Sequence, residues 1–343
     1  MNFQQWDNLL RVMNGERLKE KPAGFIIDSP WLPGWHKVPI LDYFADSGTW
    51  FNANRKAVET FPEVMFLPGF WSEFGMCTEP SAFGSKMIWH ENDLPHADKI
   101  FNDVSEFGKL IKPNVRTDGL LPFVLNRLVR NEPGIESIGH QVKFAVSRGP
   151  LNIASFLMGT TELMMGIAMS PEETARGLAV ITDFIIDWIG LQLETFSSIE
   201  GVLILDDIVG FLGETEFEAF VLPLLKRIYS SFSLKVNFFH NDAYGLITAK
   251  YLDEIGINLF NFSYNHSLTE IRKLAGNKIS LLGNIPPLEI MANGSEEDVK
   301  KSVKAALDSI EDHTRIIWSC GGGMPQNVSN ANINAFLDAL KDS

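Results

Sequence analysis

The stretch "KVNFFHNDAYG" (residues 235–245) begins with a short apolar run, continues with a histidine and an aspartate two positions apart, and ends in a Tyr-Gly pair. A short apolar run without strict alternation is typical of a strand that is buried on both faces of a parallel sheet. We therefore predict a strand over residues 235–240 that delivers His240 and Asp242 at its carboxyl end.

Seven further runs of the same kind occur along the chain, and helical patterns separate them. They lie at residues 23–28, 63–69, 141–147, 201–207, 257–263, 278–284 and 314–320. Two of the helices begin with a capping-box pattern, one at Ser170 with Glu173 and one at Ser295. Eight strands that alternate with helices predict an α/β fold, a single (β/α)₈ TIM barrel over residues 1–343, with an open doubly wound sheet as the alternative. The aromatic-rich insertion from about 70 to 140 is predicted to cap the barrel mouth.

The composition argues against several classes of partner and location. The formal net charge of −14 disfavours nucleic acid and an anionic membrane surface. The longest apolar run is interrupted by Asp183 and Asp187, and residues 1–21 lack the basic and apolar regions of a signal peptide. The two cysteines, Cys77 and Cys320, predict free thiols in a reducing compartment. These features predict a cytoplasmic protein.

Polar residues gather where the predicted strands end, which is the face on which barrels of this kind carry their active sites. These residues are Asp28, Arg148, Asp206, Asp207, His240, Asp242, Asn261, Ser263, Asn284 and Cys320. His240 and Asp242 stand at i and i+2, so both side chains point to one side of an extended segment. If the mouth brings Cys320 toward them, the three residues would form a zinc site with one open position. The alternative is a strand-end histidine bonded to a local carboxylate, with Cys320 as a small buried residue.

Two loops at the same strand ends have the features of a cofactor-binding surface. Three glycines follow Cys320, and they allow close approach of the backbone to a bound group. We expect Gly321 and Gly322 from this loop, together with Asn284 in "LLGNIPP", to contact the cofactor.

Acidic residues near the strand ends have several possible roles. One carboxylate of the Asp206-Asp207 pair is expected to cap the following segment. The other is expected to be a general base, a fourth metal ligand or a substrate anchor. We assign the catalytic role to Asp207, together with His240. Glu73 and Glu79, in the predicted cap, are expected to be surface charges.

Six stretches, taken in order, resemble successive blocks of the uroporphyrinogen decarboxylase superfamily. They are "SRGPLNIASFLMG" (147–159), "LILDDIVGFLGETEFEAFVLPLLKRI" (203–228), "FFHNDAYG" (238–245), "KISLLGNIPPLEIM" (278–291), "GSEEDVKKSVKAAL" (294–307) and "SCGGGMPQNVSNANINAF" (319–336). The resemblance covers most of the chain and is clearest from about residue 200 onward. It implies a (β/α)₈ barrel, which agrees with the strand pattern.

Within this superfamily the sequence is similar to the corrinoid-dependent methyltransferases. The decarboxylases carry an arginine-bearing loop after the first strand, whereas here "GFIID" is followed by "SPWLPGWHK", which has no arginine. The methyltransferases, of the methylcobalamin:coenzyme M type and the O-demethylase type, bind zinc through a His-x-Cys pair and a distant cysteine. His240 matches the histidine and Asp242 stands where the first cysteine would be. Cys320 lies one residue closer to its strand, counted from Pro325.

The resemblance implies zinc and a corrinoid carried by a partner protein as cofactors. Asp242 in place of a thiolate makes the ligand set harder, which favours activation of an oxygen over a thiol. The predicted function is zinc-dependent transfer of a methyl group between a small methylated substrate and the cobalt of a corrinoid protein. A methyl ether, with an aromatic body as one option, fits this substrate. Three alternatives stay open: a methylcobalamin:thiol methyltransferase, a decarboxylase that would use Arg148, and a non-catalytic barrel that binds a corrinoid partner or a small ligand.

Overall fold

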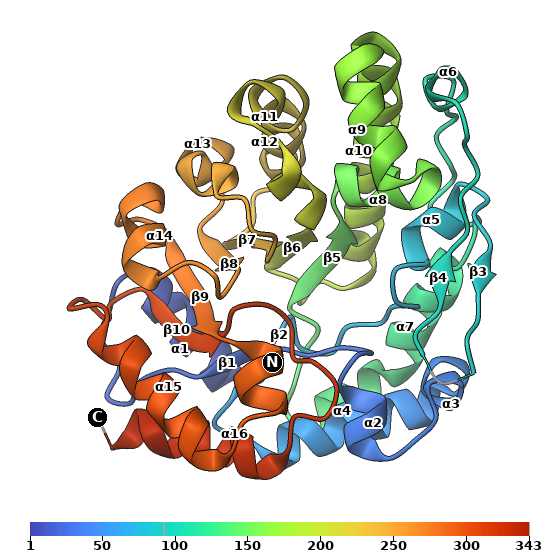
Figure 1. Cartoon of the computed structure of the whole chain (residues 1–343). Coiled ribbons are helices and arrows are strands. Elements are labelled where there is room, and N and C mark those ends of the chain that lie inside the picture. Colours follow the sequence, from blue (N-terminus) through green and yellow to red (C-terminus); the bar gives the residue numbers. More distant parts are fainter. Residues whose placement is uncertain (92, 343) are drawn as a thin grey trace.

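The computed structural model describes residues 1–91 and 93–342. In this part of the chain, eight parallel strands form the centre and helices surround them (Figure 1). The strands are β1 (Gly24–Ile26), β2 (Met65–Leu67), β5 (Phe144–Arg148), β6 (Gly201–Leu205), β7 (Val236–Asn241), β8 (Leu259–Phe262), β9 (Ser280–Ile285) and β10 (Ile316–Cys320). Each strand begins inside its predicted span and ends inside it or one residue later, so the eight predicted strands are confirmed.

The strands follow one another in chain order around the centre. β5 to β10 form one sheet of sequential neighbours, and β1 pairs with β2. Parallel bridges from Ala23 to Trp318 and from Ile26 to Gly323 place β1 beside β10. Because the first strand returns to the side of the last, the arrangement is that of a barrel and not of an open doubly wound sheet.

Side chains complete the wall of the barrel between β2 and β5. Gln192, on a helix outside the sheet, donates to the main-chain oxygen of Val146 and accepts from its N–H, both over 3.0 Å. Glu79 Oε1 accepts from the N–H of Arg148 over 3.0 Å. These bonds satisfy backbone groups of β5 that would otherwise be buried without partners.

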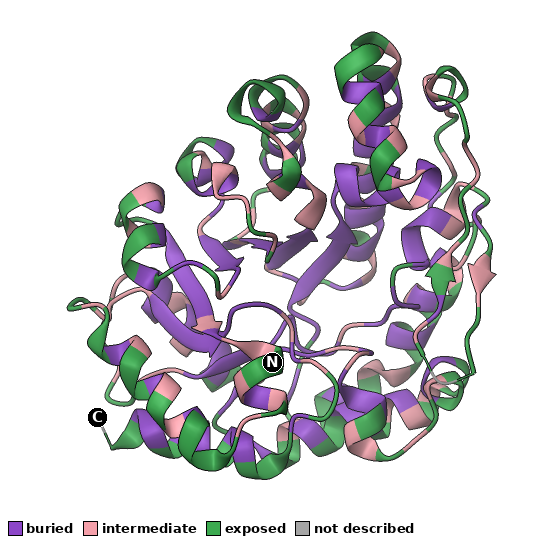
Figure 2. Cartoon of the chain, viewed as in Figure 1, coloured by how far each residue is buried: buried purple, intermediate pink, exposed green. Residues whose placement is uncertain are grey.

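Two apolar layers hold the barrel together. Leu203, Phe238 and Ile317 belong to the inner layer, which also includes residues of the first helix. Trp6 of that helix packs edge-on against Phe144, with ring centroids 5.6 Å apart. The larger outer layer fills the space between the strands and the helices. Figure 2 shows the result: the strands at the centre are almost entirely buried, and the surrounding helices expose their outer faces.

The described residues contain sixteen α-helices and three short helical segments of other types. The α-helices are α1 (Phe3–Met13), α2 (Leu32–His36), α3 (Ile40–Ala45), α4 (Ser47–Thr60), α5 (Thr78–Ala82), α6 (Val104–Phe107), α7 (Leu121–Ser137), α8 (Pro150–Met158), α9 (Thr160–Met169), α10 (Pro171–Thr195), α11 (Glu214–Phe220), α12 (Leu222–Ser230), α13 (Leu252–Ile255), α14 (Leu268–Ala275), α15 (Glu296–Asp308) and α16 (Asn330–Lys341). The short helical segments are η1 (Asp207–Phe211), η2 (Ile247–Lys250) and η3 (Pro287–Ala292).

The two predicted capping boxes differ. At the start of α15, Ser295 and Asp298 form the reciprocal box. At the start of α10, Ser170 makes no side-chain capping bond. The N–H of Ser170 already donates to the main-chain oxygen of Gly166 at the end of α9, so it is not available to Glu173.

The insertion between β2 and β5 contains a two-stranded hairpin, β3 (Met87–Ile88) and β4 (His96–Ala97), together with α5, α6 and α7. It runs along the right-hand side of the barrel in Figure 1. The N–H groups of Ile100 and Phe101 donate to the main-chain oxygen of Leu157 in α8, which anchors the insertion to the barrel. Its role as a cap over the mouth stays a prediction.

Two further expectations concern cysteines and membrane spans. Cys77 and Cys320 are buried free thiols, as predicted. Over the described ranges, no single helix is long and apolar enough to cross a membrane. The pair α8 and α9 meets that criterion only when the two helices are taken together, and they are bent by 108° at the break between them.

Candidate metal centre

Three side chains from adjacent strands meet at the barrel mouth: Asp207, His240 and Asp242. Asp207 begins η1 after β6, His240 lies in β7, and Asp242 directly follows β7. Because Leu205 of β6 pairs with His240, the ends of the two strands lie side by side. His240 Nε2 lies 3.5 Å from Asp207 Oδ1 and 3.9 Å from Asp242 Oδ2. One ligand atom from each residue lies within 4.8 Å of the other two.

The loops that carry the two carboxylates pack directly on each other because two glycines leave room between them. A Cβ added to Gly245 would stand 1.9 Å from the main-chain oxygen of Gly210. The N–H of Asp242 also donates to Asp207 Oδ1 over 3.1 Å. The backbone therefore holds two carboxylates close together although they repel each other.

Asn261, on β8, fixes the hydrogen position on His240. Its Nδ2 donates to the main-chain oxygens of Leu282 (2.7 Å) and Cys320 (3.2 Å), which leaves Oδ1 facing the imidazole. Oδ1 lies 2.7 Å from His240 Nδ1 and can only accept, so Nδ1 carries the hydrogen. Nε2 then points to the two carboxylates and is the ring nitrogen through which His240 could bind a metal. This is the arrangement of metal-binding histidines, whose other ring nitrogen donates to a fixed acceptor.

The cluster brings two carboxylates together beside one imidazole. Burial raises the pKa of Asp242, His240 lowers it and Asp207 raises it further. No lysine or arginine of the described residues lies within 4.0 Å of either carboxylate. Zinc with bonds of about 2.0–2.1 Å separates its ligand atoms by roughly 3.3 Å. The observed 3.5 and 3.9 Å are close to this spacing, so small side-chain rotations would complete a metal site.

Cys320 does not belong to this cluster, which corrects the predicted ligand set. Its side chain lies on the same face of β10 as Ile316 and Trp318, in the outer apolar layer. Ile317, on the opposite face, belongs to the barrel interior. Burial also raises the pKa of the Cys320 thiol, which disfavours the thiolate that a metal requires. In the observed cluster Asp207 stands in its place.

The glycine loop after β10 approaches the cluster. A Cβ added to Gly322, whose φ is +142°, would stand 2.8 Å from Asp242 Oδ2. A Cβ on Gly321 would stand 2.5 Å from the main chain of the loop after β8. The side chain of Asn284 donates to the main-chain oxygen of His266, so it ties two loops of the mouth together. Cofactor contacts by these three predicted residues stay a prediction.

The two aspartates after β6 have different positions. Asp206 is buried, and its carboxylate accepts from the N–H groups of Leu151 and Asn152 at the start of α8, each over 2.9 Å. It therefore caps a helix that follows the neighbouring strand β5, and not the segment that follows it in the chain. Asp207 is left to face His240, and its role as a general base stays a prediction.

A second buried group of charges occupies the other side of the mouth. Arg148 Nη2 donates to Glu73 Oε2 over 2.8 Å, and Ser29 Oγ donates to Glu73 Oε1 over 2.7 Å. Glu73 and Glu79 are each 5% exposed, whereas the sequence analysis expects surface charges for both. The signal that could have revealed their burial is their apolar surrounding in "FWSEFGMCTEP" (70–80).

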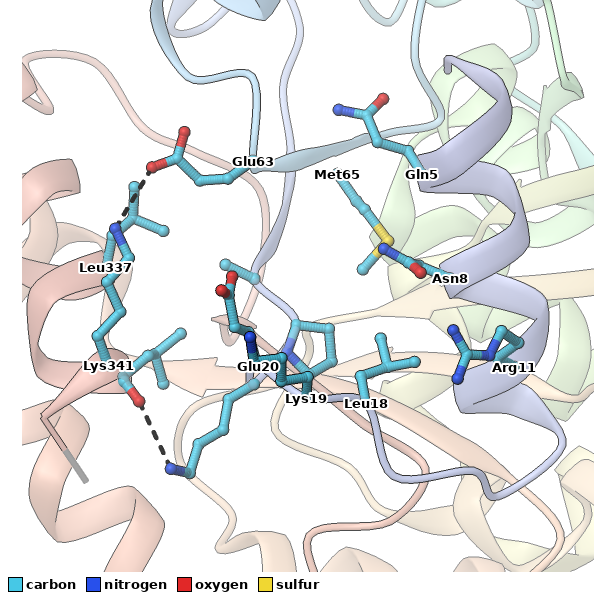
Figure 3. Close-up of a pocket in the computed structure, with 14 residues that line it drawn as sticks. Gln5, Asn8, Arg11, Leu18, Lys19, Glu20, Glu63, Met65, Leu337 and Lys341 are labelled. Atoms are coloured by element: carbon cyan, nitrogen blue, oxygen red, sulfur yellow. Dashed lines mark hydrogen bonds and ion pairs between the residues drawn. The ribbon is translucent and has the colours of Figure 1, made fainter.

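A cavity of about 500 Å³ lies at the opposite, amino-terminal end of the strands (Figure 3). It opens between α1, the segment that leads into β1, and α16. Lys341 pairs with Glu63 over 3.7 Å at its edge, and Lys21 donates to the main-chain oxygen of Leu340. The cavity therefore lies away from the cluster at the mouth and takes no part in its chemistry.

A barrel with ionisable side chains clustered at the carboxyl ends of its strands is the architecture of an enzyme. Residues 68–343 match the family described as uroporphyrinogen decarboxylase (URO-D). The chain belongs to this family, which confirms the resemblance at the level of the superfamily.

Curated relatives and solved structures extend this assignment. A uroporphyrinogen decarboxylase of Thermodesulfovibrio yellowstonii is 26% identical over 69% of this chain and 70% of its own length. The uroporphyrinogen decarboxylase of Dichelobacter nodosus is 26% identical over 98% of this chain and 97% of its own length. A methyltransferase from Methanosarcina mazei superposes with a TM-score of 0.81 at 17% identity and covers 98% of both chains. A B12-independent methionine synthase from Shewanella superposes with a TM-score of 0.53 at 12% identity and covers 86% of both chains. At these identities the structural likeness shows the barrel fold.

Proposed function

We propose that this chain is a zinc-dependent methyltransferase that moves a methyl group between a small methylated substrate and the cobalt of a corrinoid protein. The observation that carries the proposal is the cluster of Asp207, His240 and Asp242, in which the histidine keeps Nε2 available for a metal. The likeness in fold to a methyltransferase over nearly the whole chain supports it.

The chain's own groups fit a catalytic metal site. Asp207, His240 and Asp242 would hold zinc through two oxygens and one nitrogen, with a fourth position open toward the mouth. Zinc bound there would act as a Lewis acid on the atom that bears the methyl group. The two carboxylates balance its charge, and Asn261 keeps His240 in the required tautomer. A ligand set without sulfur favours an ether oxygen over a thiol as the group to be activated.

The loops around the cluster offer a surface for the partner that carries the corrinoid. Phe211, at the end of η1, and Tyr244, two residues after Asp242, are 66% and 76% exposed. Both lie on the two loops that hold the carboxylates, so a protein that covers the mouth would cover them as well. Exposed aromatic side chains next to a site are typical of contact surfaces.

A decarboxylase is the second candidate, because the curated relatives carry that name. The arginines near the loop after β2 argue against a polycarboxylate substrate. Arg148 pairs with buried Glu73. Arg127 donates to the main-chain oxygens of Phe44 and Glu73. Both guanidinium groups are thus engaged inside the protein.

The test of the proposed function is zinc binding by the wild type and by His240→Ala, with His96→Ala, an exposed histidine on β4, as the control. We expect the wild type and the control to bind zinc, and His240→Ala to bind it at least about 100-fold more weakly. Zinc should raise the melting temperature of the first two proteins and not of the third, because a ligand that binds the folded state stabilises it.

Methyl transfer should follow zinc content. Transfer from 3-methoxyphenol to reduced cobalamin, followed by visible absorption, is expected for the wild type and lost in His240→Ala. A wild type that binds no zinc at neutral pH would overturn the proposal. Decarboxylation of uroporphyrinogen by the metal-free protein would favour the second candidate.

A further inference from the structure

Two buried histidines of the described chain lie at the barrel mouth, and they differ in what their ring nitrogens face. His240 and His266 are each 6% exposed. Nε2 of His240 points to the candidate cluster. Nε2 of His266 lies 2.6 Å from the main-chain oxygen of Tyr244, and its Nδ1 lies 3.4 Å from Glu270 Oε2. Because a carbonyl oxygen can only accept, Nε2 of His266 carries a hydrogen and is not available to a metal.

The segment that carries Asp242, residues 242–245, depends on side chains for its position. In the part of the chain that the structure describes, no hydrogen bond between main-chain groups holds this segment. Three bonds from side chains hold it instead. They join the Asp242 N–H to Asp207 Oδ1 (3.1 Å), the Ala243 N–H to Asn241 Oδ1 (3.0 Å) and the Tyr244 oxygen to His266 Nε2 (2.6 Å).

The three bonds differ in what they connect the segment to. Asn241 directly precedes the segment, so its side chain moves with it. Asp207 belongs to the candidate metal site, and its carboxylate repels that of Asp242. His266 belongs to neither, because it lies in the loop after β8. Its bond to Tyr244 therefore connects the segment to a part of the barrel outside the cluster.

His266 is itself held firmly in that loop. Its N–H donates to the main-chain oxygen of Ser263 over 3.2 Å, and its main-chain oxygen accepts from the side chain of Asn284 on β9. The Tyr244 ring packs on the imidazole, with ring centroids 5.3 Å apart. The donor at Nε2 is thus fixed by two neighbouring strands before it reaches the segment.

We infer that His266 is a positioning residue of the candidate metal centre. It holds residues 242–245 by the Tyr244 carbonyl and keeps the Asp242 carboxylate beside that of Asp207 against their repulsion. The affinity of the site for zinc is therefore set in part by a residue that does not touch the metal. This inference rests on the proposed function in one respect, that Asp207, His240 and Asp242 bind zinc.

The test compares two substitutions of His266. His266→Leu removes the donor, whereas His266→Gln keeps an amide N–H at the reach of Nε2. Zinc affinity is measured by competition with a chelator. We expect His266→Leu to bind zinc about tenfold more weakly than the wild type, the contribution of one hydrogen bond to a buried group, and His266→Gln to recover most of the loss.

His313 provides the matched control at the amino-terminal end of β10. Its Nε2 also lies at a main-chain oxygen, that of Leu307 (3.1 Å), and its ring packs against Trp318 with centroids 5.3 Å apart. His313→Leu should leave the zinc affinity unchanged, because its bond is far from the mouth. Equal zinc affinities for His266→Leu and the wild type would overturn the inference. So would an equal loss in His266→Gln or in His313→Leu.

A second measurement needs no metal. Hydrogen exchange of the Asp242 and Ala243 N–H groups, followed by NMR on the zinc-free chain, reports how firmly the segment is held. We expect about tenfold faster exchange in His266→Leu, and wild-type rates in His266→Gln and His313→Leu. Unchanged exchange in His266→Leu would overturn the inference.

These outcomes are distinct from a failure of the proposed function. A wild type that binds no zinc would remove the proposed function, while faster exchange in His266→Leu alone would still support His266 as the residue that holds the segment. Zinc binding and methyl transfer that are equal in the wild type and His266→Leu would keep the proposed function and overturn the inference.

Discussion

The two sides of the barrel mouth both carry carboxylates, but they differ in how far these are buried and in what balances the charge. On the side of β5, Glu73 lies 2.8 Å from the guanidinium of Arg148. On the side of β6 and β7, Asp207 and Asp242 lie close to each other and to the His240 imidazole. A buried charge is stable only when it is paired or coordinates a metal. The first side is therefore balanced by the chain's own groups, whereas the carboxylates of the second side, 35% and 43% exposed, are open to a cation from outside the chain.

The largest expected effect of a substitution is on the first side. Arg148→Met leaves Glu73 buried without its partner, and we expect the free energy of unfolding to fall by about 3–5 kcal/mol. Urea denaturation of the zinc-free chain measures it. The double variant Arg148→Met/Glu73→Leu should recover most of the loss, because an apolar pair of similar volume replaces a buried ion pair at little cost.

An exposed ion pair provides the control for this experiment. Lys112 and Asp187 form an ion pair whose side chains are 44% and 45% exposed. Lys112→Met should cost no more than about 1 kcal/mol. If Arg148→Met cost equally little, the Arg148–Glu73 pair would be open to water, and the contrast between the two sides of the mouth would fail.

The next largest effect concerns the histidine tautomer on the second side. In Asn261→Ala the His240 imidazole loses the acceptor at Nδ1, so its hydrogen distributes between the two ring nitrogens. We expect zinc to bind about 10–100-fold more weakly, as for other residues that orient metal ligands. Competition with a zinc chelator measures the affinity, and ¹⁵N NMR of the imidazole reports the tautomer.

Asn258 offers a matched control at the other end of β8. Its amide also bridges main-chain groups, accepting from Asn237 over 2.8 Å and donating to Lys235 over 3.0 Å. Asn258→Ala should lower stability and leave zinc affinity unchanged. Equal zinc affinities for the two variants would show that Asn261 contributes to stability alone.

Some of this site could be predicted from the sequence because strand geometry is strict. The spacing of His240 and Asp242 was sufficient to place them on one side of an extended segment. The eight apolar runs were sufficient to locate the strands. The same runs do not indicate whether a given side chain points into the barrel or toward the helices, because both faces of these strands are buried. For this reason "TRIIWSC" (314–320) gives no sign that Cys320 points outward.

Other features depend on contacts between distant parts of the chain. Glu73 and Arg148 are 75 positions apart, so the residues that surround one of them in the sequence give no indication of the other. From the sequence alone, such an acidic residue is interpreted as a surface charge. Only in the fold does the barrel wall between β2 and β5 bring the arginine next to it. Asp207 was one of two adjacent aspartates, and the structure separates them because Asp206 binds the start of α8.

A smaller effect is expected at Gly322, which lies against the second side of the mouth. Its φ of +142° disfavours any other residue, and an added Cβ would stand 2.8 Å from Asp242 Oδ2. Gly322→Ala should lower the free energy of unfolding by about 1–2 kcal/mol. Zinc should also bind more weakly, because the Asp242 carboxylate must move. Gly323→Ala is the matched control, since no atom lies within 4 Å of its added Cβ. Identical zinc affinities for the two variants would remove Gly322 from the support of the site.

The smallest effect is expected at Cys320, and it decides the ligand set. Cys320→Ala should keep the zinc affinity of the wild type and cost only about 1 kcal/mol of stability for the small cavity in the outer layer. The sulfur cannot reach the cluster by a side-chain rotation, because its face of β10 is fixed by the backbone. The main-chain oxygen of Cys320 accepts from Asn261, and the N–H of Gly321 donates to Ile285 over 2.9 Å. Loss of zinc in Cys320→Ala, measured as for His240→Ala, would show that β10 rearranges when metal binds and that His240, Asp242 and Cys320 are the ligands. Retention of zinc, together with its loss in Asp207→Asn, would assign the third position to Asp207.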